Sequence, residues 1–291
     1  MSRGEKVFAV FNYLFFAFLS FTTILPFMNL IAKSFSSEAA VNAGLVTFFP
    51  VDWQMGTYQY VLSDRTFLNS FKISILVTII GTAVSLFMTA LAAYPLSKPR
   101  LRGRRLFILM YIFVMLFSGG LIPTYLLMHK LSLIDKLAVL ILPGMISVFN
   151  VLIIKNYFEA LPDSLEESAK LDGASNLAIL FRITLPLSLP VLATIALFYA
   201  VGYWNDYFAA MIYIHSTELK PLQLYLKELI AHANNAYNSA GMPLSIDSAM
   251  NATPQAIQAA SILVATVPIL LVYPFLQKYF VKGVLVGSVK G

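Results

Sequence analysis

The chain alternates between long apolar runs and polar segments, and six of the runs are long enough to cross a membrane. They cover roughly residues 7–32, 71–96, 106–128, 137–158, 187–214 and 256–280. A helix advances about 1.5 Å per residue, so about 20 apolar residues span a hydrocarbon layer of about 30 Å. The pattern therefore predicts an all-α, polytopic membrane protein with six transmembrane helices, in a single domain over residues 1–291.

Composition supports a membrane protein and narrows its chemistry. Hydrophobic residues make up 59% of the chain and charged residues 12%, whereas soluble domains average about 45–50% and about 25%. The net charge is +6, but the basic residues gather at the ends of apolar runs, which favours a membrane surface over nucleic acid. Cysteine is absent, which excludes disulfides and cysteine-based metal sites. The first run lacks a clear A-x-A cleavage site, so we expect it to be retained.

Positive charge predicts the orientation of the chain. The segment Lys98–Arg105 carries five basic residues and no acid, and short basic loops stay in the cytoplasm. With six spans, both termini and the segment 159–186 are then cytoplasmic, and the external segments are 33–70, 129–136 and 215–255. The last of these is long and polar, so it is either a solvated loop or a contact surface for a partner.

The polar segment between the fourth and fifth runs carries signals for two short helices. Ser164 and Glu167 have the spacing of a capping box, which predicts a helix start. Gly173 would end that helix, because glycine tolerates the left-handed conformation. Ser175 would cap a second helix, and Pro186 would mark the turn into the fifth span. The result is a predicted helix-turn-helix that faces the cytoplasm.

This segment resembles the EAA motif of ABC importer permeases, written E-A-A-x3-G-x9-I-x-L-P. The matching residues are Glu167-Ser168-Ala169, Gly173 and Ile183-Thr184-Leu185-Pro186, with the same spacing throughout. Ser168 replaces an alanine and is also small. In that family the segment docks in a cleft of the ATPase subunit. The resemblance implies ATPase-coupling roles for Glu167, Ala169, Asp172, Gly173, Leu185 and Pro186, although Glu167 and Gly173 could also be helix caps only.

Further stretches resemble the maltose-type carbohydrate branch of this family, closest to oligosaccharide and polysaccharide permeases. They are residues 93–97, 118–125, 171–175, 203–208 and the tail 282–291. The resemblance implies a bacterial inner-membrane location, a homologous permease subunit, two ATPase subunits and an extracellular or periplasmic solute-binding protein. The chain has no G-x-x-x-x-G-K-[ST] phosphate loop, so ATP and magnesium are expected on the ATPase and no cofactor is expected in this chain.

One aromatic stretch is a candidate lining for a sugar pathway. Sugars stack on aromatic rings and form hydrogen bonds with amides, and spacings of three and four residues place Tyr203, Trp204 and Tyr207 on one helical face. Asn205 lies beside that face. Two other readings stay open: an aromatic belt at the membrane boundary, and an amide that bridges helices. Asp206 is the main acid within the predicted spans.

Other functions have weaker support in the sequence. His129, His215 and His232 are scattered without metal-ligand spacing, so no metal site is predicted. An intramembrane enzyme would need convergent catalytic groups within the spans, and none stands out, so we expect a non-catalytic subunit. An ABC permease for amino acids, peptides or ions remains an alternative for the cargo.

Overall fold

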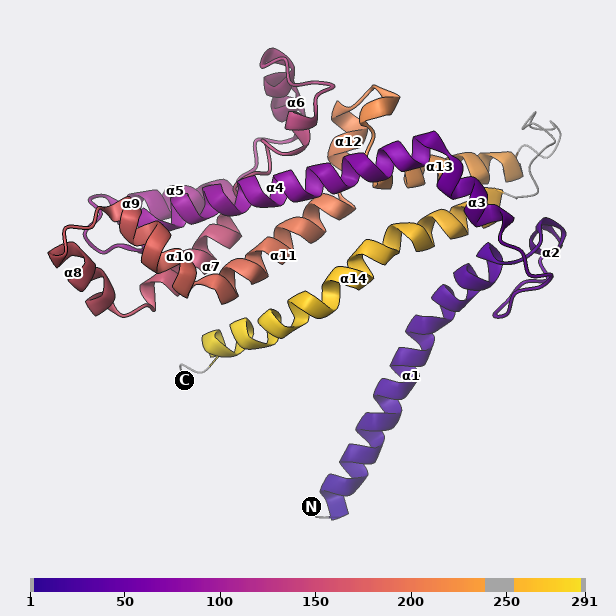
Figure 1. Ribbon diagram of the computed structural model, residues 1–291, viewed down its shortest axis with the longest axis horizontal. Helices are drawn as coiled ribbons and strands as arrows, with labels where there is room; N and C mark the ends of the chain where they lie inside the picture. The colour runs from indigo at the N-terminus through magenta and orange to yellow at the C-terminus, as the bar shows by residue number, and fades with distance from the viewer. Residues whose placement is uncertain (1–2, 239–253, 289–291) are drawn as a thin grey trace. The chain divides into compact units, whose positions relative to one another are not determined.

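The computed structural model describes residues 3–238 and 254–288, and every regular element in these ranges is a helix (Figure 1). The prediction of an all-α protein is therefore confirmed for the described residues. The elements in chain order are α1 (Arg3–Ser34), α2 (Glu38–Asn42), α3 (Gly56–Ser63), α4 (Arg65–Ser97), α5 (Arg104–Leu116), α6 (Leu121–Lys130), η1 (Leu137–Leu140), α7 (Val148–Glu159), α8 (Asp163–Leu171), α9 (Asn176–Ile179), η2 (Leu180–Thr184), α10 (Leu185–Leu187), α11 (Leu189–Asn205), α12 (Phe208–Tyr213), η3 (Thr217–Leu219), α13 (Leu222–Asn238) and α14 (Pro254–Ser288).

The helices that can cross a membrane differ from the predicted six. Three described helices are long and apolar enough on their own: Gly4–Ser34, Arg65–Ser97 and Pro254–Val272. Two bent pairs also qualify if each is one span, which raises the count to five. These pairs are α5 with α6, bent by 108°, and residues 176–187 with α11, bent by 84°. Six uninterrupted spans are therefore not confirmed.

Local backbone chemistry explains where the runs break. The run 106–128 is interrupted at Gly120, whose φ of +87° suits glycine and precedes α6. The run 137–158 is not one helix, because the chain turns at Pro143 and Gly144 and α7 begins only after Ser147. Apolar character alone does not reveal these breaks, because a membrane protein can bury irregular backbone among its helices.

Contacts divide the chain into two compact units, residues 69–224 with 269–291 and residues 1–68 with 225–268. The first unit has a core formed by α4, α7, η2 and α11. Its fully buried members include Ala93, Val151, Ile154 and Ile195. The small Ala93 side chain allows close approach of helices, which is typical of packing in membranes.

The second unit contains a folded segment after α1. The ring of Phe35 stacks on Trp53 with centroids 4.5 Å apart, and the hydroxyls of Ser34 and Tyr58 are 2.9 Å apart. The segment 33–70 therefore packs as a compact piece rather than as an extended loop. In the same unit, the Tyr225 hydroxyl donates to Asp64 over 2.9 Å, and burial together with this hydrogen bond raises the pKa of Tyr225.

The predicted external loop 215–255 is partly helical, because α13 occupies Leu222–Asn238. Residues 239–253 lie outside the described residues, as do residues 289–291 at the end of the tail 282–291. The backbone of residues 282–288 belongs to α14.

Candidate functional site

The helical knob, residues 159–187, contains α8, which begins two residues earlier than the capping box predicted. The N-cap is Pro162, which makes no side-chain cap hydrogen bond, and Ser164 lies inside the helix. The predicted capping box of Ser164 and Glu167 is therefore wrong. Pro162 has φ −60°, which suits the entry to a helix, and Asp163 supplies the negative charge that the helix start favours.

The end of α8 confirms the role predicted for Gly173. Its φ is +80°, and its N–H donates to the Lys170 carbonyl over 3.0 Å. The next N–H, of Ala174, donates to the Ala169 carbonyl over 2.9 Å. These two bonds are those of a Schellman motif, which satisfies the last carbonyls of a helix.

The second helical part of the knob also starts as predicted. The Ser175 hydroxyl accepts from the Ala178 N–H over 3.3 Å and caps α9. The helix continues through the π-helical η2 and through α10, and the 84° bend follows at Ser188. The turn therefore lies two residues beyond Pro186, which sits within the short α10.

The knob presents most of the predicted coupling residues to solvent. Glu167, Asp172, Gly173 and Pro186 are exposed, whereas Ala169 and Leu185 are half-buried. Leu171, between Glu167 and Asp172 along the chain, is 89% exposed. An isolated apolar side chain is common on surfaces, but one held at the tip of a well-capped knob is suited to insert into a partner.

The basic loop 98–105 lies against the knob, and this contact was not predicted from the sequence. Glu166 pairs with Lys98 and Arg100 of the loop and with Lys170 of its own helix. A second acid, Glu159, pairs with Arg104 and Lys155. The only sequence signal was complementary charge: five cations in one short segment, and an acid-rich segment elsewhere in the chain.

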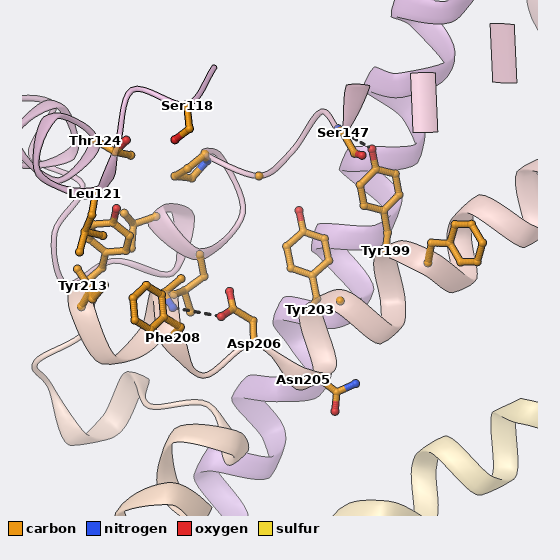
Figure 2. Close-up of a pocket in the computed structure, with 18 of the residues that line it drawn as sticks. Ser118, Leu121, Thr124, Ser147, Tyr199, Tyr203, Asn205, Asp206, Phe208 and Tyr213 are labelled. Carbon is orange, nitrogen blue, oxygen red and sulfur yellow. Dashed lines mark hydrogen bonds between the residues drawn. The ribbon is translucent and has the colours of Figure 1, made fainter. Parts of the chain in front are cut away.

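A cavity of about 970 Å³ lies within the unit formed mainly by residues 69–224. Its lining combines α6, the loop after η1, the start of α7, the C-terminal half of α11, and α12. Figure 2 shows the rings of Tyr199 and Tyr203 projecting from α11 in the same direction, with Ser118, Leu121 and Thr124 on another side of the pocket. Two stretches that are far apart in sequence, 118–125 and 203–208, therefore contribute to one cavity.

Hydrogen bonds from α4 hold two of the three tyrosines that line this cavity. The Tyr203 hydroxyl lies 2.7 Å from the Ser85 hydroxyl, and the Tyr199 hydroxyl lies 2.6 Å from that of Thr89. Gly81 leaves room for the Tyr203 ring, because a Cβ there would lie 2.8 Å from it. The rings are therefore oriented by a neighbouring helix, and the cavity wall is organised before any ligand arrives.

Among the described residues that line the cavity, Asp206 is the one with an acidic or basic side chain. One carboxylate oxygen accepts from the Ala209 N–H over 3.1 Å, at the start of α12. An ionisable group in a membrane protein is costly unless it faces a polar cavity or a partner. Asp206 therefore gives this cavity a polar and negative point between aromatic walls.

The structure separates the four predicted path residues. Tyr203 and Asn205 line the cavity, and the Asn205 amide donates to the Val201 carbonyl over 2.9 Å. Trp204 is 6% exposed, packs edge-on against Phe71 with centroids 5.9 Å apart, and is not part of the lining. The predicted single helical face of Tyr203, Trp204 and Tyr207 is wrong, because α11 ends at Asn205 and Tyr207 lies in the break.

Histidines and acids show no metal arrangement in the described part of the chain, where no group of three or more such ligands converges. The His129 ring stacks on Tyr125, and the side chain of His232 lies outside the described residues. The His215 N–H donates to Asp135 over 3.0 Å, and the Ser216 N–H and hydroxyl donate to the same carboxylate. These hydrogen bonds lower the pKa of Asp135.

Comparison with known proteins places the chain among membrane transport subunits. Residues 86–286 match the family described as "Binding-protein-dependent transport system inner membrane component". Protein LplC of Bacillus subtilis is 48% identical over all of this chain and 97% of its own length. The polygalacturonan/rhamnogalacturonan transport system permease protein YtcP of the same organism is 43% identical over 99% of both chains.

Solved structures agree with this assignment. A chain of a bacterial ABC transporter involved in the import of the acidic polysaccharide alginate has a TM-score of 0.87 and 35% identity, over 96% of this chain and 99% of that one. A chain of an alginate ABC transporter in complex with a periplasmic protein that holds an alginate pentasaccharide shares the fold, with a TM-score of 0.56 and 15% identity. The resemblance found in the sequence is confirmed, and this chain belongs to the family of inner membrane components of binding-protein-dependent ABC transport systems.

Proposed function

We propose that this subunit forms, with a homologous permease, the translocation pathway for an oligosaccharide or polysaccharide fragment. The observation that carries the proposal is the cavity of about 970 Å³, whose mostly apolar lining also contains three tyrosines, two asparagines and a carboxylate. Aromatic faces suit the apolar faces of sugar rings, and the polar groups suit their hydroxyls. The names of the relatives LplC and YtcP and of the alginate transporter agree in part, since two of the three name polysaccharides.

Within this pathway, Tyr203 and Asn205 are the proposed contacts, and Asp206 accepts hydrogen bonds from sugar hydroxyls. Trp204 packs against Phe71 outside the lining. Tyr207 lies in the break between α11 and α12, outside the lining of this cavity, and is a proposed path residue beside it. The cargo would be delivered by an external solute-binding protein, as the family description indicates.

The knob is the proposed contact with the ATPase subunits, which would bind ATP and magnesium. Glu167, Asp172 and Gly173 would meet the ATPase directly, and Ala169, Leu185 and Pro186 would maintain the shape of the knob. ATP binding then needs to bias a two-state membrane domain by only a few kcal/mol. Both termini and the knob would face the cytoplasm in a lipid bilayer, in keeping with the basic loop beside the knob.

Uptake by a reconstituted complex tests this function. The subunit, its permease partner, the ATPase and the binding protein are placed in proteoliposomes, and labelled oligosaccharides and peptides are offered separately. We expect ATP-dependent uptake of an oligosaccharide only. Uptake of peptide without uptake of oligosaccharide would show that the cargo is wrong.

Coupling is tested in the same complex by Glu167→Lys. This variant should insert and assemble normally but hydrolyse ATP without uptake, because the reversed charge meets the partner at an exposed position. The control for charge reversal is Glu218→Lys, at an exposed acid outside the knob. Normal coupled transport by Glu167→Lys would refute the docking role.

A further inference from the structure

Glu166 lies where cations from two segments converge. Lys98 and Arg100 reach it from the basic loop after α4, and Lys170 reaches it from one turn further along α8. The Arg100 contact is 2.8 Å and the Lys170 contact is 2.6 Å. The side chain of Glu166 is only 12% exposed and that of Lys98 is 17% exposed. Such shielding reduces screening by water and salt, so this pair is stronger than an ordinary surface ion pair.

The basic loop also holds the second helical part of the knob. Arg100 donates to the Asn176 side chain over 2.8 Å, at the first residue of α9. The start of the loop is hydrogen-bonded to the last turn of α4, because the Lys98 N–H donates to the Pro95 carbonyl over 3.1 Å. Glu166 and Asn176 are therefore tied to the C-terminal end of α4.

We call the contacts of Lys98 and Arg100 with Glu166 and Asn176 the joint. The helix α4 extends from this joint to the cavity. On the same helix, Ser85 and Thr89 are fully buried and bond the hydroxyls of Tyr203 and Tyr199. The helix α4 is continuous from Arg65 to Ser97, with Pro95 inside its last turn, so we expect a displacement at its C-terminal end to move these two contacts as well. The second helical part of the knob also packs on α4, because the Phe181 ring stacks on Phe87 with centroids 6.3 Å apart and Leu180 belongs to the core. Glu166 adds a connection between α4 and the first helix of the knob, α8.

We propose that Glu166 is a positioning residue that connects α8 of the knob to α4, so that movement of the knob also moves α4 together with Tyr199 and Tyr203. The proposal rests on the proposed coupling function. The basic loop would then transmit movement of the knob to α4, in addition to setting the orientation in the membrane. Lys98 and Arg100 are the loop residues through which this movement passes.

The first test measures sugar transported per ATP hydrolysed by the reconstituted complex. Glu166→Gln keeps the shape and removes the charge, and we expect the ratio to fall by about fivefold or more while ATPase activity remains. The matched control is Lys170→Gln, which removes a pair within α8 and leaves the joint to α4 intact, so the ratio should stay normal. Glu166→Lys should uncouple, and combining it with Lys98→Glu and Arg100→Glu should restore coupling.

The second test follows the joint itself. The chain has no cysteine, so cysteines in place of Arg102 and Asp163, both exposed, can carry spin labels. We expect one narrow distance between loop and knob that is the same with and without ATP, and a broadened one in Glu166→Gln. A distance that changes with ATP in the otherwise unmodified complex would overturn the proposal.

The two proposals fail in different ways. If Glu167→Lys uncouples the complex and Glu166→Gln does not, the joint is wrong and the docking function stands. If neither variant affects coupling, the docking function is wrong as well.

Discussion

The hydroxyl of Tyr199 lies 2.6 Å from the hydroxyl of Thr89, which joins α11 to α4 at the wall of the cavity. The Tyr199 hydroxyl also accepts from the Ser147 N–H over 3.0 Å. One phenol therefore connects three segments: α4, α11 and the start of α7.

Thr89→Val should destabilise the protein, because it leaves the buried Tyr199 hydroxyl without its α4 partner. A cost of about 1–3 kcal/mol is expected for such a group, measured as a lower thermal midpoint in detergent. Tyr199→Phe should cost a similar amount, and the double variant should cost less than the sum, since both remove the same bond. Thr194→Val is the control, because that hydroxyl bonds a carbonyl of its own helix; an equal cost there would contradict the cross-helix role.

Gly81→Ala should reshape the cavity, because the new methyl would lie 2.8 Å from the Tyr203 ring. A glycine-to-alanine change within a helix otherwise stabilises by about 0.5–1 kcal/mol, so a lower thermal midpoint would report the clash. We expect slower oligosaccharide uptake as well. Gly56→Ala, with no atom within 4 Å, should show no loss. If the ring is the obstacle, Gly81→Ala should no longer lower the thermal midpoint when it is added to Tyr203→Ala and compared with Tyr203→Ala alone.

Gly173→Ala should loosen the knob, because a residue with a Cβ is disfavoured at a φ of +80° by about 1–2 kcal/mol. The expected result is faster amide hydrogen exchange over α8 and α9, with less sugar moved per ATP. Gly173→Asn should be milder, since asparagine tolerates this conformation. Gly44→Ala carries the same backbone penalty at a φ of +68° in the other unit. Uncoupling by Gly44→Ala would mean that general instability, rather than the knob, is responsible.

Asp135 should make the stability of the protein depend on acid pH. Hydrogen bonds from Ser216 and His215 lower its pKa in the folded state below the ordinary value of 3.8. Its stabilising contribution is therefore complete above that ordinary value and is lost as the pH falls through the lower, folded pKa. As the pH is lowered through this range, the thermal midpoint should fall less steeply in Asp135→Asn than in the wild-type protein. Ser216→Ala should move the transition upward, toward 3.8, and an unchanged profile would contradict this account.

Local sequence chemistry predicted the knob well. Gly173 and Ser175 act within a few residues of themselves, through a left-handed turn and a side-chain cap, so spacing alone was informative. The capping box failed because the helix starts two residues earlier, with Pro162 as N-cap and Asp163 in the first turn. Short-range signals can compete with one another, and a sequence does not show which one prevails.

Apolar content identified a membrane protein but not the course of its helices. The breaks at Gly120, Pro143 and Asp206 interrupt runs that look continuous in hydrophobicity. The break after Asn205 also separated Tyr207 from the helical face assumed for it, and it is where Asp206 enters the cavity.

The sequence by itself determined the all-helical membrane class, the family and the knob, because each depends on composition or on contacts between near neighbours. Only the tertiary structure decided that Glu166 pairs with Lys98 and that α4 holds Tyr199 and Tyr203. Those relationships join side chains far apart along the chain. Their pairing depends on how whole helices pack. Periodicity shows which residues share a face of one helix, but not which residues of another helix they contact.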